Sequence, residues 1–212
     1  MLHVDALIFD LDGTLWDTNA ICAEAWNRVL QRMGIERPAV TEADIAGICG
    51  RPHREAVGAV LSELDEAKLD AISVATERED NLLIAERGGR LYPGVRELIP
   101  ELAERFPLMI VSNCQDGYIE VFLEQSGLDA SFRDHECWGR TGNTKSENLR
   151  SVIARNGVRA PLFVGDTEGD ARAARDNAVP FVFASYGFGE VEVFDLQLHR
   201  FEQLAGRVAP LG

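Results

Sequence analysis

The sequence lacks several features that would assign the chain to a special class of protein. No apolar stretch reaches the about 20 residues that a transmembrane helix needs. The N-terminus has no basic segment followed by an apolar one, as a signal peptide has. The four cysteines are far apart and form no Cys-x-x-Cys pair, so they predict neither a zinc site nor a disulfide framework. We therefore expect reduced thiols in a cytoplasmic protein.

Positive charge is also scarce. The 212 residues include 21 Lys and Arg against 35 Asp and Glu, which gives a formal net charge of −14. This acidity argues against nucleic-acid and membrane partners, because phosphate backbones and anionic lipids bind basic surfaces. With 46% hydrophobic and 26% charged residues, the rest of the composition is that of an ordinary globular protein. We expect either a monomer or a homodimer.

The chain divides into a helical block and a block in which strands and helices alternate. Helical patterns occupy most of residues 16–90, where no strand pattern occurs: 17–33, 42–48, 53–63 and 65–87. Apolar strands are expected in the opening run from Val4 to Phe9 and again at 108–111, 162–164 and 181–184, with a weaker segment near 132–138. Helices are expected between them at 95–105, 116–126, 145–156 and 168–176, and near 200–208 in the tail. Such alternation predicts an α/β fold, a Rossmann-like parallel sheet with helices on both faces. We predict a core of residues 1–15 and 91–212, split by an all-helical cap of residues 16–90 inserted after the first strand.

Two carboxylates follow the first strand directly. Asp10 and Asp12 are two residues apart, so in an extended segment their side chains point the same way. Gly13 allows a turn and a close approach to a ligand, and Thr14 offers a hydroxyl to stabilise the turn. A turn with a helix cap explains an isolated Asp-x-Asp-Gly equally well.

Polar residues also follow two later strands. Ser112 and Asn113 end the strand at 108–111, and Asp166 and Asp170 follow the strand at 162–164. Ligands of open parallel sheets bind at the carboxyl ends of the strands, where these residues would converge. Four carboxylates in one cleft need a cation, and hard oxygen ligands with water suit Mg²⁺. Helix capping remains the simpler explanation for each cluster taken alone.

These motifs together resemble the haloacid dehalogenase superfamily, within its phosphoglycolate-phosphatase-like group. Asp10-Leu11-Asp12-Gly13-Thr14 is similar to the first family motif, Ser112-Asn113 to the second, Lys145 to the third and Gly165-Asp166-x-x-x-Asp170 to the fourth. The resemblance spans the chain, and Leu91-Tyr92-Pro93-Gly94-Val95 is similar to the return from a helical cap. One departure is Ser146 after the lysine, where many relatives have proline.

The resemblance implies Mg²⁺-dependent hydrolysis of a small phosphorylated metabolite. It implies that Asp10 attacks phosphorus and that Asp12 protonates the leaving oxygen and then activates water. Further residues are implied to bind the metal or the substrate: the Asp12 carbonyl with Asp10, Asp166 and Asp170 for Mg²⁺, Ser112 and Asn113 for the phosphoryl oxygens, Lys145 for charge, and Thr14 for the loop.

Three other functions stay open. A dehalogenase of the superfamily lacks the second acid, which is present here as Asp12. A sugar-phosphate mutase keeps both acids, but in similar mutases the position of Cys22 is typically a histidine. A phosphate-sensing or receiver-like module also gathers acids and a lysine, although it would be shorter and would carry no helical insert. We expect the turn Gly50-Arg51-Pro52-His53 to determine substrate specificity, with Arg51 or His53 contacting a second anionic group of the substrate. The alternative is that this segment is only a solvated basic turn at the start of a helix.

Overall fold

A six-stranded parallel sheet forms the centre of the molecule in the computed structural model, which describes residues 1–211. The strand order is β6-β5-β2-β7-β8-β9, so the first strand of the sheet along the chain, β2, lies in the middle. The strands are β2 (Ala6–Phe9), β5 (Leu108–Ser112), β6 (Asp134–Cys137), β7 (Pro161–Gly165), β8 (Phe181–Ala184) and β9 (Leu196–Leu198). The predicted parallel sheet is confirmed.

Alternate residues of the central strand belong to two separate hydrophobic cores. Leu7 and Phe9 pack in the larger core, whereas Ala6 and Ile8 pack in the smaller one on the opposite face. Side chains of a strand alternate between the two faces of its sheet, so a strand covered on both faces is apolar throughout. This explains the continuous apolar run that precedes Asp10.

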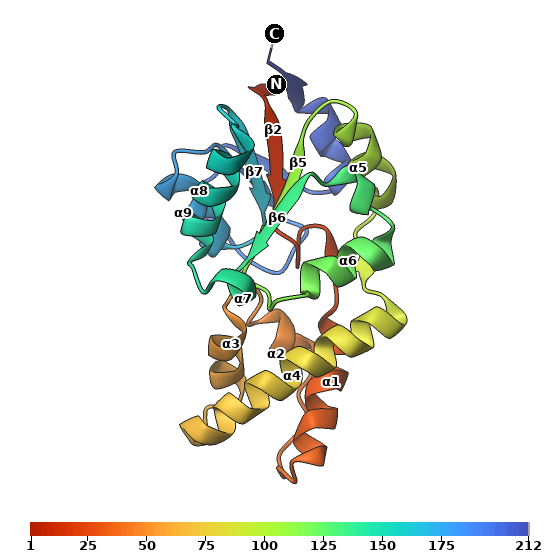
Figure 1. Ribbon diagram of the computed structural model, residues 1–212, viewed down its shortest axis with the longest axis vertical. Helices are drawn as coiled ribbons and strands as arrows, with labels where there is room; N and C mark the ends of the chain where they lie inside the picture. Colours follow the sequence, from red (N-terminus) through yellow and green to blue (C-terminus); the bar gives the residue numbers. More distant parts are fainter. Residues whose placement is uncertain (212) are drawn as a thin grey trace.

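Helices cover both faces of the sheet, as the alternating pattern predicts. Figure 1 shows α5 and α6 on one side and α8 and α9 on the other. Their bounds are α5 (Val95–Ala103), α6 (Tyr118–Ser126), α8 (Lys145–Asn156) and α9 (Glu168–Asp176), and the short α7 (Trp138–Thr141) precedes α8. Each of α8 and α9 begins at a capping box, with Thr144 and Glu147 in the first and Thr167 and Asp170 in the second.

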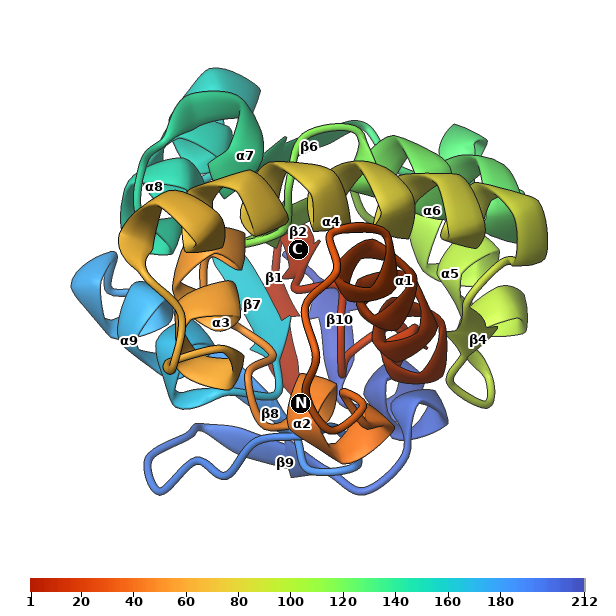
Figure 2. The same ribbon diagram turned by 90° about the horizontal axis from the view of Figure 1, so that it is seen from below.

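The helices of the inserted segment lie together beyond one end of the sheet (Figure 1). They are α1 (Asn19–Arg32), α2 (Glu42–Ala46), α3 (His53–Val60) and α4 (Glu66–Arg87). Seen from below in Figure 2, α4 crosses the full width of the molecule beside α1. It also meets the core, where Asn81 Nδ2 donates to the Asp116 carbonyl at 3.0 Å. The carboxyl ends of the strands therefore face a helical layer.

Three details of the sequence-based expectations are wrong. The opening apolar run is broken at Asp5, whose carboxylate accepts hydrogen bonds from the Arg159 and Ala160 amides, so β1 (Leu2–Val4) instead pairs with β10 (Val208–Pro210). The segment from residue 16 to 90 does contain strand, because β3 (Trp16–Asp17) pairs with β4 (Arg90–Leu91) where the chain leaves and re-enters the core. In the tail, the expected helix is the 3₁₀ helix η2 (Phe201–Gly206).

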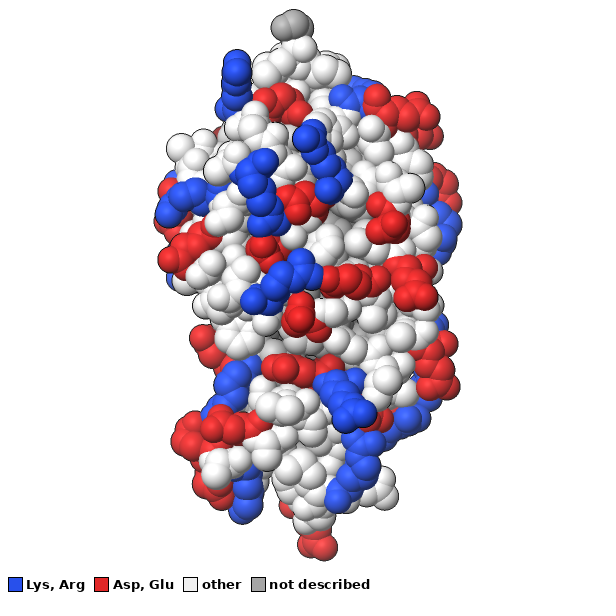
Figure 3. Space-filling view, in the orientation of Figure 1, with Lys and Arg blue, Asp and Glu red and all other residues white. Residues whose placement is uncertain are grey.

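Charges of both signs are interspersed on the surface. On the face shown in Figure 3, basic side chains lie beside acidic ones over both the sheet domain and the helical layer. Within residues 1–211, no helix combines the length and apolar character needed to cross a membrane.

Candidate active site

The carboxyl ends of β2, β5 and β7 bring the first set of predicted residues together. β2 pairs in parallel with both β5 and β7, so the three strands end side by side. Asp10 directly follows β2, Ser112 is the last residue of β5, and Asp166 directly follows β7. Parallel pairing of the three strands thus places Asp10, Ser112 and Asp166 near one another although they are far apart in sequence, as expected for an open parallel sheet.

Asp10, Asp166 and Asp170 form a buried acidic cluster. One carboxylate oxygen from each lies within 4.8 Å of the other two, and the side chains are at most 2% exposed. Burial and the neighbouring Asp170 raise the pKa of Asp10 to about 7, and burial with the same neighbour raises that of Asp166. Three acids this close need a cation or protons, and all-oxygen ligands of this kind fit a hard divalent ion such as Mg²⁺.

Lys145 supplies one buried positive charge to this cluster. Its Nζ lies 2.8 Å from Asp10 Oδ1 and 2.5 Å from Asp170 Oδ1. Burial alone would lower the pKa of Lys145, but the two carboxylates outweigh it and raise the pKa above its usual value. Lys145 is therefore charged and held in place by the two carboxylates. The sequence alone, which places this lysine in a polar loop, would equally allow a solvated side chain.

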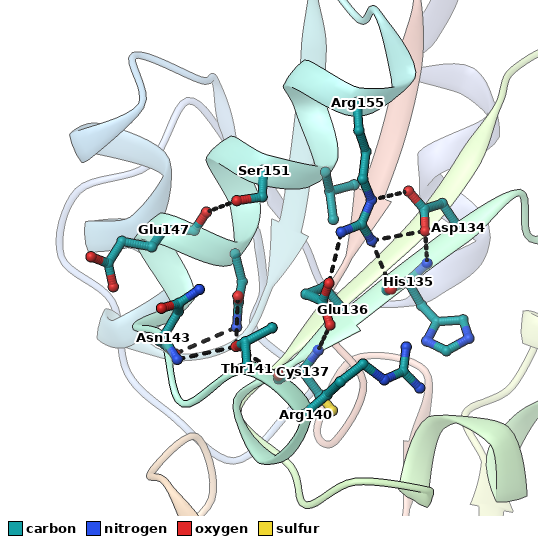
Figure 4. A network of polar contacts seen from close by, with 12 residues as sticks. Asp134, His135, Glu136, Cys137, Arg140, Thr141, Asn143, Glu147, Ser151 and Arg155 are labelled. Carbon is teal, nitrogen blue, oxygen red and sulfur yellow. Dashed lines mark hydrogen bonds and ion pairs between the residues drawn. The ribbon is translucent and has the colours of Figure 1, made fainter.

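The helix that begins at Lys145 is tied to the edge strand of the sheet. Figure 4 shows Arg155, near the end of α8, reaching β6, where its guanidinium contacts Asp134, Glu136 and the His135 carbonyl. At the other end of α8, the Thr141 hydroxyl donates to Asn148 Oδ1 at 2.9 Å. These contacts fix the helix that places Lys145 against the acids.

The Asp12 carboxylate is not one of the three that form the acidic cluster. Asp12 Oδ1 accepts a hydrogen bond from the Tyr118 hydroxyl at 2.7 Å and lies 3.4 Å from the Thr18 hydroxyl. Burial raises the pKa of Asp12 to about 6, and these two hydrogen bonds partly offset the rise. Asp10 and Asp12 nevertheless line the same cavity.

Gly13 allows the backbone to pass directly beside Asp166. It has a φ of +81°, and a Cβ there would lie 2.1 Å from Asp166 Oδ2. The same oxygen accepts a hydrogen bond from the Phe188 amide at 2.8 Å, and the buried Thr14 hydroxyl donates to Asp166 Oδ1 at 3.4 Å. Thr14 thus contacts Asp166 and does not line the cavity.

A cavity of about 80 Å³ lies between these residues and the helical layer. Ser112 and Asn113 line its core side together with Asp10 and Asp12. Asn113 Nδ2 donates to the Gly50 carbonyl at 2.7 Å, which connects the core to the turn before α3. Arg51 lines the cavity too, but its side chain is exposed at the rim.

Four residues of the site carry no recognisable functional signal in the sequence: Thr18, Trp26, Asp80 and Tyr118. Tyr118 lies in α6, one turn beyond the second motif, and Thr18 precedes α1. The Cys22 thiol donates to the Thr18 hydroxyl at 3.6 Å, and that hydroxyl in turn lies 3.4 Å from Asp12 Oδ1. From the helical layer, Trp26 and Asp80 line the cavity, and so does His53 of the turn that was expected to set substrate specificity. Their positions follow from helix packing, which a single sequence does not specify.

Comparison with known proteins identifies relatives over nearly the whole chain. The profile of the family described as haloacid dehalogenase-like hydrolase matches residues 7–184. The chain is 30% identical over 202 residues to a phosphoglycolate phosphatase of Agrobacterium fabrum, covering 90% of this chain and 84% of that protein. It is also 30% identical over 191 residues to a phosphoglycolate phosphatase of Synechococcus elongatus, covering 88% and 86%.

Solved structures share the fold. A haloacid dehalogenase-like family hydrolase from Streptococcus pneumoniae superposes with a TM-score of 0.83 at 19% identity, covering 96% of this chain and 98% of that one. A predicted phosphoglycolate phosphatase from Haemophilus somnus superposes with a TM-score of 0.80 at 22% identity, covering 98% and 99%.

Proposed function

The chain belongs to the haloacid dehalogenase-like hydrolase family and is a phosphatase, and on that premise we propose that it hydrolyses a small-molecule phosphate monoester through an aspartyl-phosphate, with Mg²⁺. One observation carries this proposal. Asp10 Oδ1 is paired with Lys145, whereas Asp10 Oδ2 has no hydrogen-bond partner within residues 1–211, and Asp12 lines the same cavity. A buried nucleophile with one free oxygen thus lies beside a second carboxyl that can carry a proton.

Asp10 is the proposed nucleophile. Its free carboxylate oxygen attacks phosphorus, the bond from phosphorus to the ester oxygen breaks, and the alcohol leaves with that oxygen. Water then attacks the phosphorus of the aspartyl-phosphate, and the bond to Asp10 breaks to release inorganic phosphate. Lys145 holds Asp10 Oδ1 and so orients the other oxygen towards the cavity.

Asp12 is the proposed general acid and then general base. In its protonated form it gives a proton to the departing ester oxygen, and in its ionised form it takes one from the attacking water. A pKa raised to about 6 by burial keeps both forms accessible near neutral pH. The hydrogen bonds from Tyr118 and Thr18 hold the carboxyl in one orientation during both steps.

The metal fits the acidic cluster through its donor chemistry. Asp10 and Asp166 offer carboxylate oxygens, and we add the Asp12 main-chain carbonyl by family resemblance. Both Asp170 oxygens are already occupied, one by Lys145 and the other by the Thr167 amide and hydroxyl, so Asp170 acts as a supporting residue. When bound, Mg²⁺ neutralises phosphate charge and lets an anionic nucleophile approach.

Ser112 and Asn113 are the proposed phosphoryl-binding residues, and Arg51 is a proposed contact at the rim. Residues 16–90 are the proposed cap, joined to the core at the β3–β4 pair, and they exclude water from the cavity when closed. The four cysteines are all free in the structure. We propose a cytoplasmic protein that is either a monomer or a homodimer.

The direct test is hydrolysis of p-nitrophenyl phosphate with MgCl₂, after removal of other metals. We expect Asp10→Asn to lower kcat by about 10³-fold or more, because the amide cannot act as the nucleophile. Acid quenching during turnover should trap phosphate on the wild-type chain and none on Asp10→Asn. Turnover that is unchanged in Asp10→Asn, or unaffected by chelation of the metal, would contradict the proposal.

A further inference from the structure

Asp80 is a buried acid in the cavity that the proposed reaction does not use. It lies on α4, is 2% exposed and lines the cavity opposite the core. Its Oδ2 accepts a hydrogen bond from Trp26 Nε1 at 3.2 Å. Its Oδ1 has no hydrogen-bond partner within residues 1–211. A buried acceptor that stays unpaired is costly, so such an oxygen indicates a partner that binds from the cavity.

The surroundings of Asp80 offer Oδ1 no strong hydrogen-bond donor. The neighbouring Cys22 thiol lies 3.6 Å from the Thr18 hydroxyl and also acts on Asp80, but a thiol is only a weak donor. Burial raises the pKa of Asp80 well above its usual range, and the hydrogen bonds from Trp26 and Cys22 only partly offset this. A donor on Oδ1 would therefore stabilise the ionised carboxylate.

His53 is a second buried titratable residue among those that line the cavity. Its Nε2 lies 2.8 Å from Thr76 Oγ1, and the Thr76 hydroxyl donates to the Ile72 carbonyl at 2.8 Å. His53 is thus held against α4 through the Thr76 side chain. Burial lowers the pKa of His53 to about 4, so the ring is neutral near pH 7 and adds no positive charge to the cavity.

The residues that line the cavity supply little positive charge near Asp80. Among the residues that line the cavity, Arg51 is the one Lys or Arg, and it is exposed at the rim. The amide of Asn113 and that of Gln115 already donate to the Gly50 carbonyl and to Asn81 Oδ1. A second anion of the substrate would meet Asp80 without a buried cation beside it.

We infer that Asp80 is a specificity-determining residue and that the leaving group in this cavity carries a hydrogen-bond donor, a hydroxyl or an ammonium, in place of a second anion. The inference rests on the proposed phosphatase function and narrows its substrate class to phosphorylated polyols or amino alcohols.

Two matched series of phosphate esters test this inference. The two-carbon series is ethyl phosphate, 2-hydroxyethyl phosphate, phosphoethanolamine and phosphoglycolate. The three-carbon series is propyl, 3-hydroxypropyl, 3-aminopropyl and 2-carboxyethyl phosphate. In at least one series we expect kcat/KM of the hydroxyl or ammonium ester to exceed that of the alkyl ester about 10- to 100-fold, as for a hydrogen bond to a charged group. The carboxylate ester should fall below the alkyl ester. The hydroxyl and ammonium arms separate polyol from amino-alcohol substrates.

Asp80→Asn is the decisive variant because it keeps shape and can still accept from Trp26. Its amide nitrogen would then occupy the place of Oδ1 and offer a donor where the wild type has an acceptor. We expect the preference for donor-bearing esters to fall about tenfold or more and discrimination against the carboxylate ester to weaken. Asp70→Asn is the matched control: it makes the same charge change on α4, but Asp70 is 68% exposed and lies outside the cavity.

Binding separates this inference from the proposed function. Dissociation constants of both series are measured by calorimetry on Asp10→Asn and on Asp10→Asn combined with Asp80→Asn, so that no turnover is needed. Loss of the ranking in the double variant supports the inference, even if the wild type hydrolyses none of the esters. An unchanged ranking, or tighter binding of the carboxylate esters to Asp10→Asn than of the hydroxyl and ammonium esters, overturns it.

Discussion

Asp10 and Asp12 are two residues apart, yet their carboxylates have different partners. Asp10 is paired with Lys145 and faces other acids, whereas Asp12 is bound by two hydroxyls. Their pKa values are raised to about 7 and about 6, mainly by burial. A cation would lower the first far more than the second, since the Asp12 carboxylate is not in the cluster. Different surroundings thus allow one acid to stay ionised while the other exchanges a proton.

Tyr118→Phe tests the role of the hydrogen bond to Asp12. The hydroxyl stabilises the ionised carboxylate, so its loss should raise the pKa of Asp12 further above 6, by about one unit. We expect the limb of the kcat/KM profile that reports Asp12 to move upwards by the same amount, with kcat about tenfold lower because the carboxyl is less well oriented. The measurement is the pH dependence of kcat/KM for p-nitrophenyl phosphate with MgCl₂.

The substitution should leave the surrounding packing intact. The Tyr118 ring packs edge-on against Trp16 with centroids 5.4 Å apart, and phenylalanine keeps that contact. Tyr186→Phe is a matched control, because its hydroxyl donates to the Thr14 carbonyl and not to Asp12. If Tyr118→Phe and Tyr186→Phe gave the same pH profile as the wild type, the hydrogen bond would have no role in tuning Asp12.

At the scale of elements, α8 connects the edge of the sheet to the site. Its first residue, Lys145, is buried against the acids, and its last turn is held by Arg155 on Asp134 and Glu136 (Figure 4). Arg155→Met should lower the free energy of unfolding by about 1–2 kcal/mol, because a partly exposed network of several ion pairs stabilises a protein more than one isolated surface pair does. Urea unfolding followed by circular dichroism measures this loss.

The activity of Arg155→Met should stay within about threefold of the wild type when the protein is folded, because the Thr144 capping box still fixes the start of α8. Arg150→Met provides the matched control. Arg150 lies on the same helix and is exposed, and within residues 1–211 its side chain makes one hydrogen bond, to Asn177 Oδ1 at 3.2 Å, so a loss of about 0.5 kcal/mol or less is expected. Equal destabilisation by both substitutions would show that the network contributes nothing specific.

Elements with strong local signals were predictable from the sequence. Helices α8 and α9 occupy 145–156 and 168–176, as predicted, because capping boxes and the stop at Gly157 are local features. The strand at 181–184 has its predicted bounds too. In contrast, β3 and β4 are two residues long and exist only through their pairing with each other. The break at Asp5 likewise depends on amides more than 150 residues away, which no local pattern contains.

The same distinction applies to the site. Asp10, Ser112 and Asp166 were predictable because each follows an apolar strand and the topology brings the strand ends together. Tyr118 and Asp80 were not, because each is one polar position on a helix with nothing local to mark it. Their importance appears only when α4 and α6 are placed around the cavity, a consequence of tertiary packing.

At the scale of the whole molecule, the net charge of −14 makes the internal acids costly. Asp10, Asp12 and Asp166 have pKa values raised above those of the unfolded chain, mainly by burial. Between about pH 4 and pH 7 the metal-free folded state therefore binds more protons than the unfolded state. The contribution of these three acids to the free energy of unfolding is therefore largest below pH 4, and it falls as the pH rises from about 4 to about 7. A bound cation reverses this cost, but only where the carboxylates are ionised.

Thermal stability should therefore depend on Mg²⁺ and on pH together. We expect MgCl₂ to raise Tm by about 5 °C or more at pH 7.5, and by less than half as much at pH 5, where protons compete for the same carboxylates. Differential scanning fluorimetry with MgCl₂ or with chelator measures both shifts. Asp166→Asn should raise Tm of the metal-free protein at pH 7.5 and abolish the response to Mg²⁺, whereas the exposed Asp129→Asn should behave as the wild type. A Mg²⁺ response that is equal at both pH values, or retained in Asp166→Asn, would exclude this cluster as the metal site.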